Sequence, residues 1–306
     1  MANDKPVSLD DVLARVDNLP TISLVAIRVG ELVNDPKMGA REISKVMAQD
    51  PSLSAKVLKL VNSSYYAIPG GVADVERAIS FIGFNALYQL VLTVSVFRAL
   101  KTPGGATFDA RGLWLHSLAV GSASDVIARR LGHPDPSTCF TAGLLHDFGK
   151  IALAKAEGER FARALDSARR DAVSMHIAEA KVGLPSHERV GSRLAKNWRF
   201  PANLLIPIEN HHKRKHQSVR RDLSTPLLGM LDIVSLADDV CRMYSIGDGG
   251  SPKLEEPDAD ALDALGMTTL SLDGIYTDMM RVLEKSRTFL ALMDEPPAPA
   301  EQPVTG

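Results

Sequence analysis

Apolar residues recur along most of the chain at the spacing of a helix face, and the strict alternation typical of strands hardly occurs. The clearest helix follows Asp50-Pro51, where an aspartate suited to capping precedes a proline at the first helical position. We therefore predict an all-α protein of roughly a dozen helices joined by short loops. The apolar positions of the helix after Asp50 are Leu53, Val57, Leu58, Leu60 and Val61.

Capping residues, prolines and glycines mark the ends of further helices. Ser8 and Asp11 have the spacing of a capping box, and Gly132 is suited to end a long helix. The predicted helices run from Leu9 to Asn18, from Asp74 to Gly83, from Asn85 to Leu100, from Asp109 to Leu131, from Pro201 to His212, and onward from Thr225-Pro226.

Two glycine-rich and proline-rich segments interrupt this helical pattern and suggest domain boundaries. The segments are Thr102-Pro103-Gly104-Gly105 and the predicted linker from Ile246 to Pro252. Residues 295–306 hold four prolines and little apolar side chain, so we expect a disordered tail there. The expected organisation is an N-terminal helical lobe at 1–104, a second helical lobe at 105–245, and a linker with short helices and the tail at 246–306.

Composition and charge exclude several classes of protein. Hydrophobic residues make up 45% of the 306 residues and charged residues 24%, as in ordinary globular proteins. The 35 basic and 37 acidic residues give a formal charge of −2, which argues against a nucleic-acid-coating protein. The longest apolar run, 87–97, is shorter than the roughly 20 residues of a membrane span. With no apparent signal peptide and only two, distant cysteines, we expect a cytoplasmic protein without a membrane segment.

Candidate chemistry centres on His146-Asp147, which is followed by Gly149 and Lys150. Adjacent histidine and aspartate at a helix end can both turn toward one point, and this pair of ligand types suits zinc, manganese or iron. Lys150 lies one helical turn beyond Asp147 and can place an ammonium group beside a phosphate. The dipeptide alone is weak evidence, because it occurs often by chance.

Further histidines and an aspartate strengthen the metal hypothesis. Asp238 lies within an apolar helix, where a buried carboxylate needs a cation or ion partner. Together with Asp147 these side chains are numerous enough for a two-metal site in which one aspartate bridges both ions. The additional candidates are His116, His187, His211, His212 and Asp238.

Structural explanations remain open for several of these features. His116 taken alone is better explained as a histidine hydrogen-bonded inside a helical bundle than as a ligand, and His212 can instead be a residue that supports the ligands. The basic run 213–216 with Arg220 and Arg221 suits a phosphorylated ligand or simply a solvated loop. The remaining histidines, His133, His176 and His216, are predicted at the surface, and Cys139 and Cys241 are predicted to pack rather than bind metal.

The histidine and aspartate order resembles the HD superfamily of metal-dependent phosphohydrolases, and the chain as a whole resembles its HDOD relatives in bacterial signalling. The resemblance extends from about Leu19 to Asp239. The blocks that carry it are Leu19-Pro20, Asp50 to Ser54, Leu58 to Tyr66, Ala78 to Gly83, and His187 to Gly191 followed by Trp198, Pro201 and His211-His212.

By resemblance to the HD and HD-GYP enzymes, an iron, manganese or zinc site is implied, up to dinuclear. Asp147 and Lys150 would then be catalytic, Asp147 as the bridging ligand and Lys150 as the residue that faces phosphate. Two departures argue against cyclic di-GMP hydrolysis: no Gly-Tyr-Pro follows His212, and Gly112 stands where a third-metal glutamate is expected. The implied ligands are His116, His146, Asp147, His187, His211, His212 and Asp238.

Two functions therefore stay open. HDOD proteins are regarded mainly as regulatory modules, which implies a signal-transduction output module that binds a signalling protein or a small phosphorylated ligand. The complete set of ligand-type residues instead favours an active metal-dependent phosphohydrolase acting on a nucleotide or cyclic dinucleotide.

Overall fold

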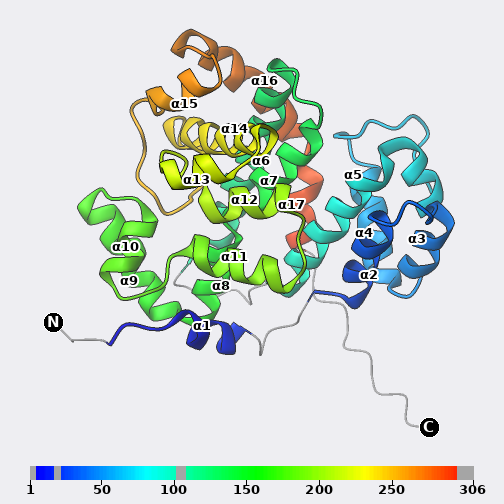
Figure 1. Ribbon diagram of the computed structural model, residues 1–306, viewed down its shortest axis with the longest axis horizontal. Helices are drawn as coiled ribbons and strands as arrows, with labels where there is room; N and C mark the ends of the chain where they lie inside the picture. Colours follow the sequence, from blue (N-terminus) through cyan, green and yellow to red (C-terminus); the bar gives the residue numbers. More distant parts are fainter. Residues whose placement is uncertain (1–4, 17–21, 101–107, 295–306) are drawn as a thin grey trace. The chain divides into compact units, whose positions relative to one another are not determined.

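The computed structural model describes residues 5–16, 22–100 and 108–294. Within these ranges it contains seventeen α-helices, one 3₁₀ helix and no strand, which confirms the all-α prediction (Figure 1). The chain divides into two compact units, a larger one of residues 1–21 and 102–286 and a smaller one of residues 22–101 and 287–306.

The smaller unit is built from five helices of the described chain. Three of them, α2, α3 and α4, pack on the long helix α5, and α17 packs on α4. Gly83 interrupts α5 with a φ of 80°, at the point where the sequence predicts one helix to end and another to begin. The bounds are α2 Leu24–Val33, α3 Ala40–Met47, α4 Pro51–Val61, α5 Val75–Ala99 and α17 Arg287–Asp294.

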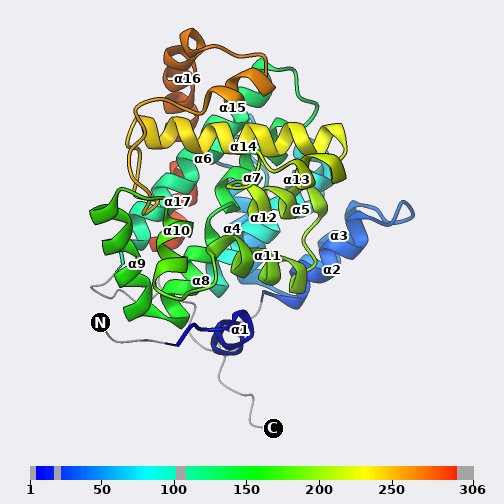
Figure 2. The same ribbon diagram turned by 60° about the vertical axis from the view of Figure 1, so that its left-hand side comes forward.

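The larger unit contains the other described helices. Its centre is the pair α6 and α7, with α14 lying against α6, α7 and α12 (Figure 2). The bounds are α1 Leu9–Val16, α6 Ala110–Arg130, α7 Pro136–Leu145, α8 Phe148–Ala156, α9 Gly158–Asp171, α10 Met175–Lys181, α11 His187–Asn197, α12 Ala202–Asn210, α13 Gln217–Asp222, α14 Thr225–Met243, α15 Ala259–Ala264, η1 Thr269–Ser271 and α16 Leu272–Lys285.

The two units differ from the expected lobes at both ends of the chain. Helix α1 belongs to the larger unit, because it buries Val12 and packs on α8 and α11. Helix α17 belongs to the smaller unit, because Phe289 is buried there. The predicted break at 102–105, the predicted tail at 295–306 and the Leu19-Pro20 block lie outside the described residues.

Local capping follows the sequence. The Oγ of Ser8 accepts the backbone N–H of Asp11, and the Asp11 carboxylate accepts the backbone N–H of Ser8, as a capping box requires. Asp50, Asp74 and Asp109 each accept a backbone N–H in the first turn of the helix that follows. These caps explain why the predicted starts of α4, α5 and α6 agree with the structure.

Helix α5 is the only described helix long and apolar enough to cross a membrane by length and composition. An 18-residue window of it has a mean hydropathy of 1.6, and 67% of that window is buried inside the protein. A core helix of a compact unit has these same properties.

Candidate metal centre

The predicted site residues lie on six helices of the larger unit or at their ends, and they meet in its interior. His116 lies in the second turn of α6, and Asp238 lies in the middle of α14. His146 and Asp147 lie between α7 and α8, and Lys150 lies in the first turn of α8. His187 is the first residue of α11, and His211 directly follows α12. Their exposed fractions are all low: 2% for His116, 1% for His146, Asp147 and His187, 3% for Lys150, 4% for His211 and 6% for Asp238.

One oxygen of Asp147 faces the ligand candidates of α6, α7 and α14. Asp147 Oδ2 lies 3.3 Å from His146 Nε2 and 4.0 Å from His116 Nε2. On the same side, Asp238 Oδ1 lies 3.0 Å from His116 Nε2 and 4.0 Å from His146 Nε2. We call His116, His146 and Asp238 the Oδ2 half of the site.

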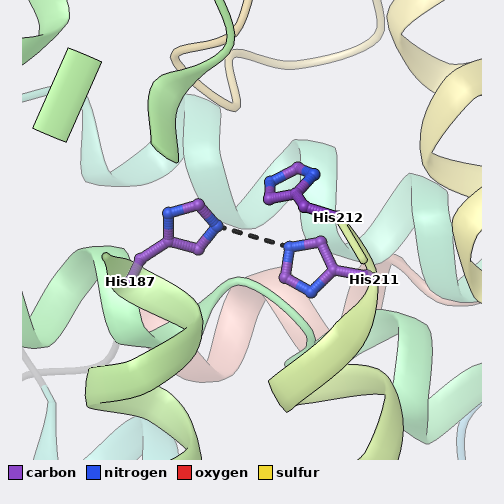
Figure 3. Close-up of side chains that lie close together, drawn as sticks. All are labelled: His187, His211 and His212. Atoms are coloured by element: carbon purple, nitrogen blue, oxygen red, sulfur yellow. Dashed lines mark hydrogen bonds between the residues drawn. The ribbon is translucent and has the colours of Figure 1, made fainter. Parts of the chain in front are cut away.

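The other Asp147 oxygen faces the histidines of α11 and α12. Asp147 Oδ1 lies 3.3 Å from His187 Nε2 and 3.6 Å from His211 Nε2, and these two nitrogens lie 3.3 Å apart (Figure 3). His212 lies beside them, with a ligand nitrogen within 4.8 Å of both. We call His187, His211 and His212 the Oδ1 half of the site.

Four of the histidine rings are held through Nδ1 by a backbone carbonyl or a carboxylate. In each ring Nδ1 is next to an acceptor, so it carries the proton and leaves the Nε2 lone pair directed at the centre. This arrangement is typical of histidines that bind a metal through Nε2. The Nδ1 partners are Ile246 O for His116 at 3.3 Å, Gly143 O for His146 at 2.7 Å, Glu179 for His187 at 2.9 Å and Pro207 O for His211 at 3.0 Å.

Several buried atoms at the centre lack hydrogen-bond partners. His146 Nε2, Asp147 Oδ1 and His212 Nε2 are each buried without one. Unpaired buried polar atoms are unfavourable, and divalent cations in the two halves would satisfy all three. Imidazole nitrogens with carboxylate oxygens suit zinc, manganese or iron, so the residues fit the metal that the sequence implies.

Electrostatics keep Asp147, His211 and His212 in forms that bind a cation, whereas His187 holds a proton that a metal ion would have to displace. Burial would raise the pKa of Asp147, but His146 and Lys150 outweigh burial and hold the pKa well below its usual range. Burial lowers the pKa of His211 and of His212, so both remain neutral. Burial also disfavours the charged form of His187, but the Glu179 carboxylate outweighs it and raises the pKa to about 10.

Lys150 is bound within the site instead of facing an open phosphate pocket. Its Nζ lies 2.5 Å from Asp147 Oδ2 and donates to the carbonyl of Gly249 at 2.8 Å. Gly249 belongs to the segment 246–252, predicted as a linker between domains. The structure instead packs this segment on the site, where Ile246 O lies beside His116 and a Cβ at position 249 would lie 2.9 Å from the His116 ring.

Two residues near the site were not recognised in the sequence. Glu179 of α10 is fully buried behind His187, although nothing in its local pattern marks it. His176 was predicted at the surface, but its ring centroid lies 4.5 Å from that of His212 and its Nδ1 is buried without a hydrogen-bond partner. The sequence offers only its spacing, since Glu179 is an acid eight residues before His187. That its helix packs against α9 and α11 is known only from the structure.

The basic run after His212 is paired within the chain. Arg214 and Lys215 each lie 2.8 Å from the carboxylate of Asp258, and Arg220 lies 2.8 Å from Asp232. These intramolecular pairs favour a structural role over the binding of a phosphorylated ligand.

The two cysteines contact other groups. Cys139 Sγ lies 3.6 Å from His133 Nδ1, and Cys241 Sγ lies 3.8 Å from Met279 Sδ. Both thiols are buried, and burial raises the pKa of Cys139 to about 12. The thiols therefore remain protonated, which agrees with their prediction as packing residues.

Comparison with solved structures identifies the fold. A protein of unknown function with an HDOD domain, from Geobacter sulfurreducens, has a TM-score of 0.72 and 22% identity, covering 92% of this chain and 97% of that one. A protein from Marinobacter aquaeolei VT8, provisionally named a signal transduction protein, has a TM-score of 0.71 and 20% identity, covering 94% and 65%. A protein from Shewanella amazonensis SB2B, provisionally named a phosphohydrolase, has a TM-score of 0.68 and 22% identity, covering 92% and 98%.

Sequence comparison gives the family. An uncharacterised protein of Treponema pallidum (strain Nichols) is 22% identical over 203 residues, which is 66% of this chain. The matches span 39% and 28% of the lengths of the curated relatives found. The sequence profile of the HDOD domain matches residues 19–214, a segment that includes every site candidate except Asp238. With most of its length matched in this way, and with the helical fold of an HDOD protein, the chain belongs to the HDOD domain family.

Proposed function

We propose that this HDOD protein is a signal-transduction output module built around a metal centre of the HD type. One observation carries the proposal: the two oxygens of Asp147 face two sets of imidazole Nε2 atoms, and the rings are held from behind through Nδ1. Such an arrangement concentrates lone pairs in a buried space, which is unfavourable unless a cation binds there.

The two halves of the site assign the ligands. His116, His146 and Asp238 would hold an ion on the Oδ2 side of Asp147, and His187, His211 and His212 would hold one on the Oδ1 side. Bound iron, manganese or zinc would supply Lewis-acid chemistry toward a phosphate and would also tie six helices together.

The closed geometry favours the regulatory function over catalysis. Two of the three N–H donors of Lys150 are used on Asp147 and on the Gly249 carbonyl, and the segment 246–252 packs on His116. Structural metal sites are typically closed, whereas catalytic sites keep a position for water or substrate. We propose a cytoplasmic module whose partner is a signalling protein or a small phosphorylated ligand.

A metal-dependent phosphohydrolase acting on a nucleotide is the second candidate. The observation that favours it is the buried ammonium of Lys150, which lies beside the Asp147 carboxylate. A cation at this point can stabilise a phosphoryl oxygen once Gly249 moves away. In that case Asp147 and Lys150 would be the catalytic residues.

Metal analysis of protein purified without chelator tests the centre itself. We expect one to two equivalents of iron, manganese or zinc, because two sets of imidazole and carboxylate donors face Asp147. A content below about a tenth of an equivalent that reconstitution does not restore would contradict the metal centre.

The variant Asp147→Ala separates the two functions. If the protein is an enzyme, hydrolysis of a phosphoester should fall at least about a hundredfold and the cellular output should disappear with it. If it is a regulatory module, folded Asp147→Ala protein should retain its partner binding and output wherever the parent shows no hydrolysis. Circular dichroism identifies the folded variant, since the unpaired ligands left behind reduce stability.

A further inference from the structure

The two halves of the site differ in what lies behind their ligands. In the Oδ1 half, the ring of His187 is backed by a carboxylate, that of Glu179. In the Oδ2 half, both histidines are backed by neutral backbone carbonyls, those of Gly143 and Ile246. This difference bears on which half binds a cation more tightly.

Glu179 holds His187 at three points. Its two oxygens both lie 2.9 Å from His187 Nδ1, and Oε2 also accepts the backbone N–H of His187 at 2.8 Å. The carboxylate is fully buried and so fixes both the ring and the first residue of α11. A carboxylate behind an imidazole makes Nε2 a stronger donor and fixes its direction.

The Oδ2 half already contains a cation. The ammonium of Lys150 lies 2.5 Å from Asp147 Oδ2 and is held from the other side by the Gly249 carbonyl. A metal ion entering this half would be repelled by that charge and would compete with it for the same carboxylate oxygen.

The charged side chains around the two halves also favour metal binding in the Oδ1 half. Glu188 also lies next to the Oδ1 half, with its carboxylate 3.9 Å from His187 Nδ1 and 3.8 Å from the Lys213 ammonium, so this half has two acidic groups around it besides Asp147, one of them paired with a lysine. In the Oδ2 half, Arg242 lies 4.0 Å from the Asp238 carboxylate, and the ammonium of Lys150 adds a second positive charge beside Asp147. The electrostatic environment therefore favours a divalent cation on the Oδ1 side.

We propose that Glu179 is a positioning residue that makes the His187, His211 and His212 half the tight metal site, while Lys150 keeps the other half weak. The inference rests on the proposed metal centre and deepens it. The first equivalent of metal binds on the Oδ1 side, and the second binds only against the charge of Lys150.

Titration of the full-length, chelator-stripped protein with Mn²⁺, and with Co²⁺ as a spectroscopic probe, tests this order. Glu179→Gln keeps the side-chain volume and removes the charge, so we expect it to weaken the tight class of sites about 10- to 100-fold and to change the first-equivalent cobalt spectrum. Lys150→Met should strengthen the weak class. The matched control is Asp232→Asn, which also removes a buried carboxylate, one paired with Arg220.

The outcomes separate this inference from the proposed function. A parent protein that binds neither ion overturns the metal centre, and this inference with it. A parent that binds metal, with a tight class unchanged in folded Glu179→Gln or weakened equally in Asp232→Asn, overturns only the role of Glu179. If Glu179→Gln does not fold, the variants His211→Ala and His146→Ala test the order of binding instead. Loss of the tight class in His146→Ala but not in His211→Ala would contradict the proposed order.

Discussion

At the scale of single residues, Gly149 shows how closely two helices must approach to build the site. A Cβ at this position would collide with the carbonyl of His187 and would lie 2.8 Å from the backbone nitrogen of Gly191. The backbones of α8 and α11 therefore touch here. Because Asp147 precedes Gly149 by two residues, this contact places its carboxylate 3.3 Å from His187 Nε2.

We expect Gly149→Ala to destabilise the protein by about 1–3 kcal/mol, because a methyl group would force the two backbones apart. The metal content should fall as well, since Asp147 and His187 move with those backbones. Denaturant unfolding and metal analysis of the purified variant measure both effects.

Gly229 is the matched control, because it lies within helix α14 and no atom lies within 4 Å of a Cβ built on it. Alanine there should be neutral or should stabilise the protein by up to about 1 kcal/mol. Equal effects of the two substitutions would contradict the close-approach argument.

At the scale of elements, the start of α4 combines a local cap with a contact distant in sequence. The Asp50 carboxylate accepts the N–H of Leu53 at 2.9 Å, which the sequence predicts. It also lies 2.7 Å from Arg98 at the end of α5, forty-eight residues away, and accepts the Ser23 hydroxyl at 3.3 Å. One side chain thus joins three helices of the smaller unit.

The cap and the ion pair of Asp50 can be separated by pH. Burial would raise the pKa of Asp50, but the Leu53 N–H and Arg98 outweigh burial and lower it below 3.8. The stabilisation from its charge is therefore present above pH 3.8 and is lost as the pH falls through the folded-state pKa.

We expect Asp50→Ala to cost about 1 kcal/mol at pH 7, because it removes the cap. Asp50→Asn keeps a capping oxygen and should cost less than about 1 kcal/mol, a deficit that disappears in acid. Thermal unfolding of parent and variants from pH 7 to about pH 2 measures this. A deficit of Asp50→Asn that persists unchanged below pH 3 would exclude the charge contribution.

At the scale of the whole molecule, the end of the described chain completes the smaller unit. Phe289 of α17 is 1% exposed, and its ring centroid lies 6.3 Å from that of Tyr65, edge to face. Leu292 is buried on the same helix. A helix far from α2–α5 in the sequence thus belongs to their core.

Two truncations test this assignment. Ending the chain after Ser286 removes α17 and should lower the melting temperature of the smaller unit by at least about 10 °C, because burial of Phe289 alone is worth about 3–5 kcal/mol. Ending it after Asp294 removes only the proline-rich residues 295–306 and should leave the temperature unchanged, as calorimetry can show. A fall of several degrees in the second truncation would show that those residues dock.

The features that the sequence determined by itself depend on residues within about one helical turn. Caps such as Asp50 and Asp109, the glycine break in α5 and the His146-Asp147 turn between two helices act locally, so their chemistry can be read along the chain. The metal candidates that the structure brings together were also predicted, because their order resembles that of HD proteins. Their convergence from six helices was inferred only through that resemblance.

Tertiary structure alone decided the surroundings of those candidates. Glu179 reaches His187 because α10 packs on α11, and Lys150 donates to Gly249, ninety-nine residues away, because the segment 246–252 packs on the site. His176 of α10 likewise lies beside His212, which is thirty-six residues further along the chain. Such contacts depend on how helix faces pack in three dimensions, and no spacing along one helix encodes which distant backbone carbonyl or carboxylate will meet a given side chain.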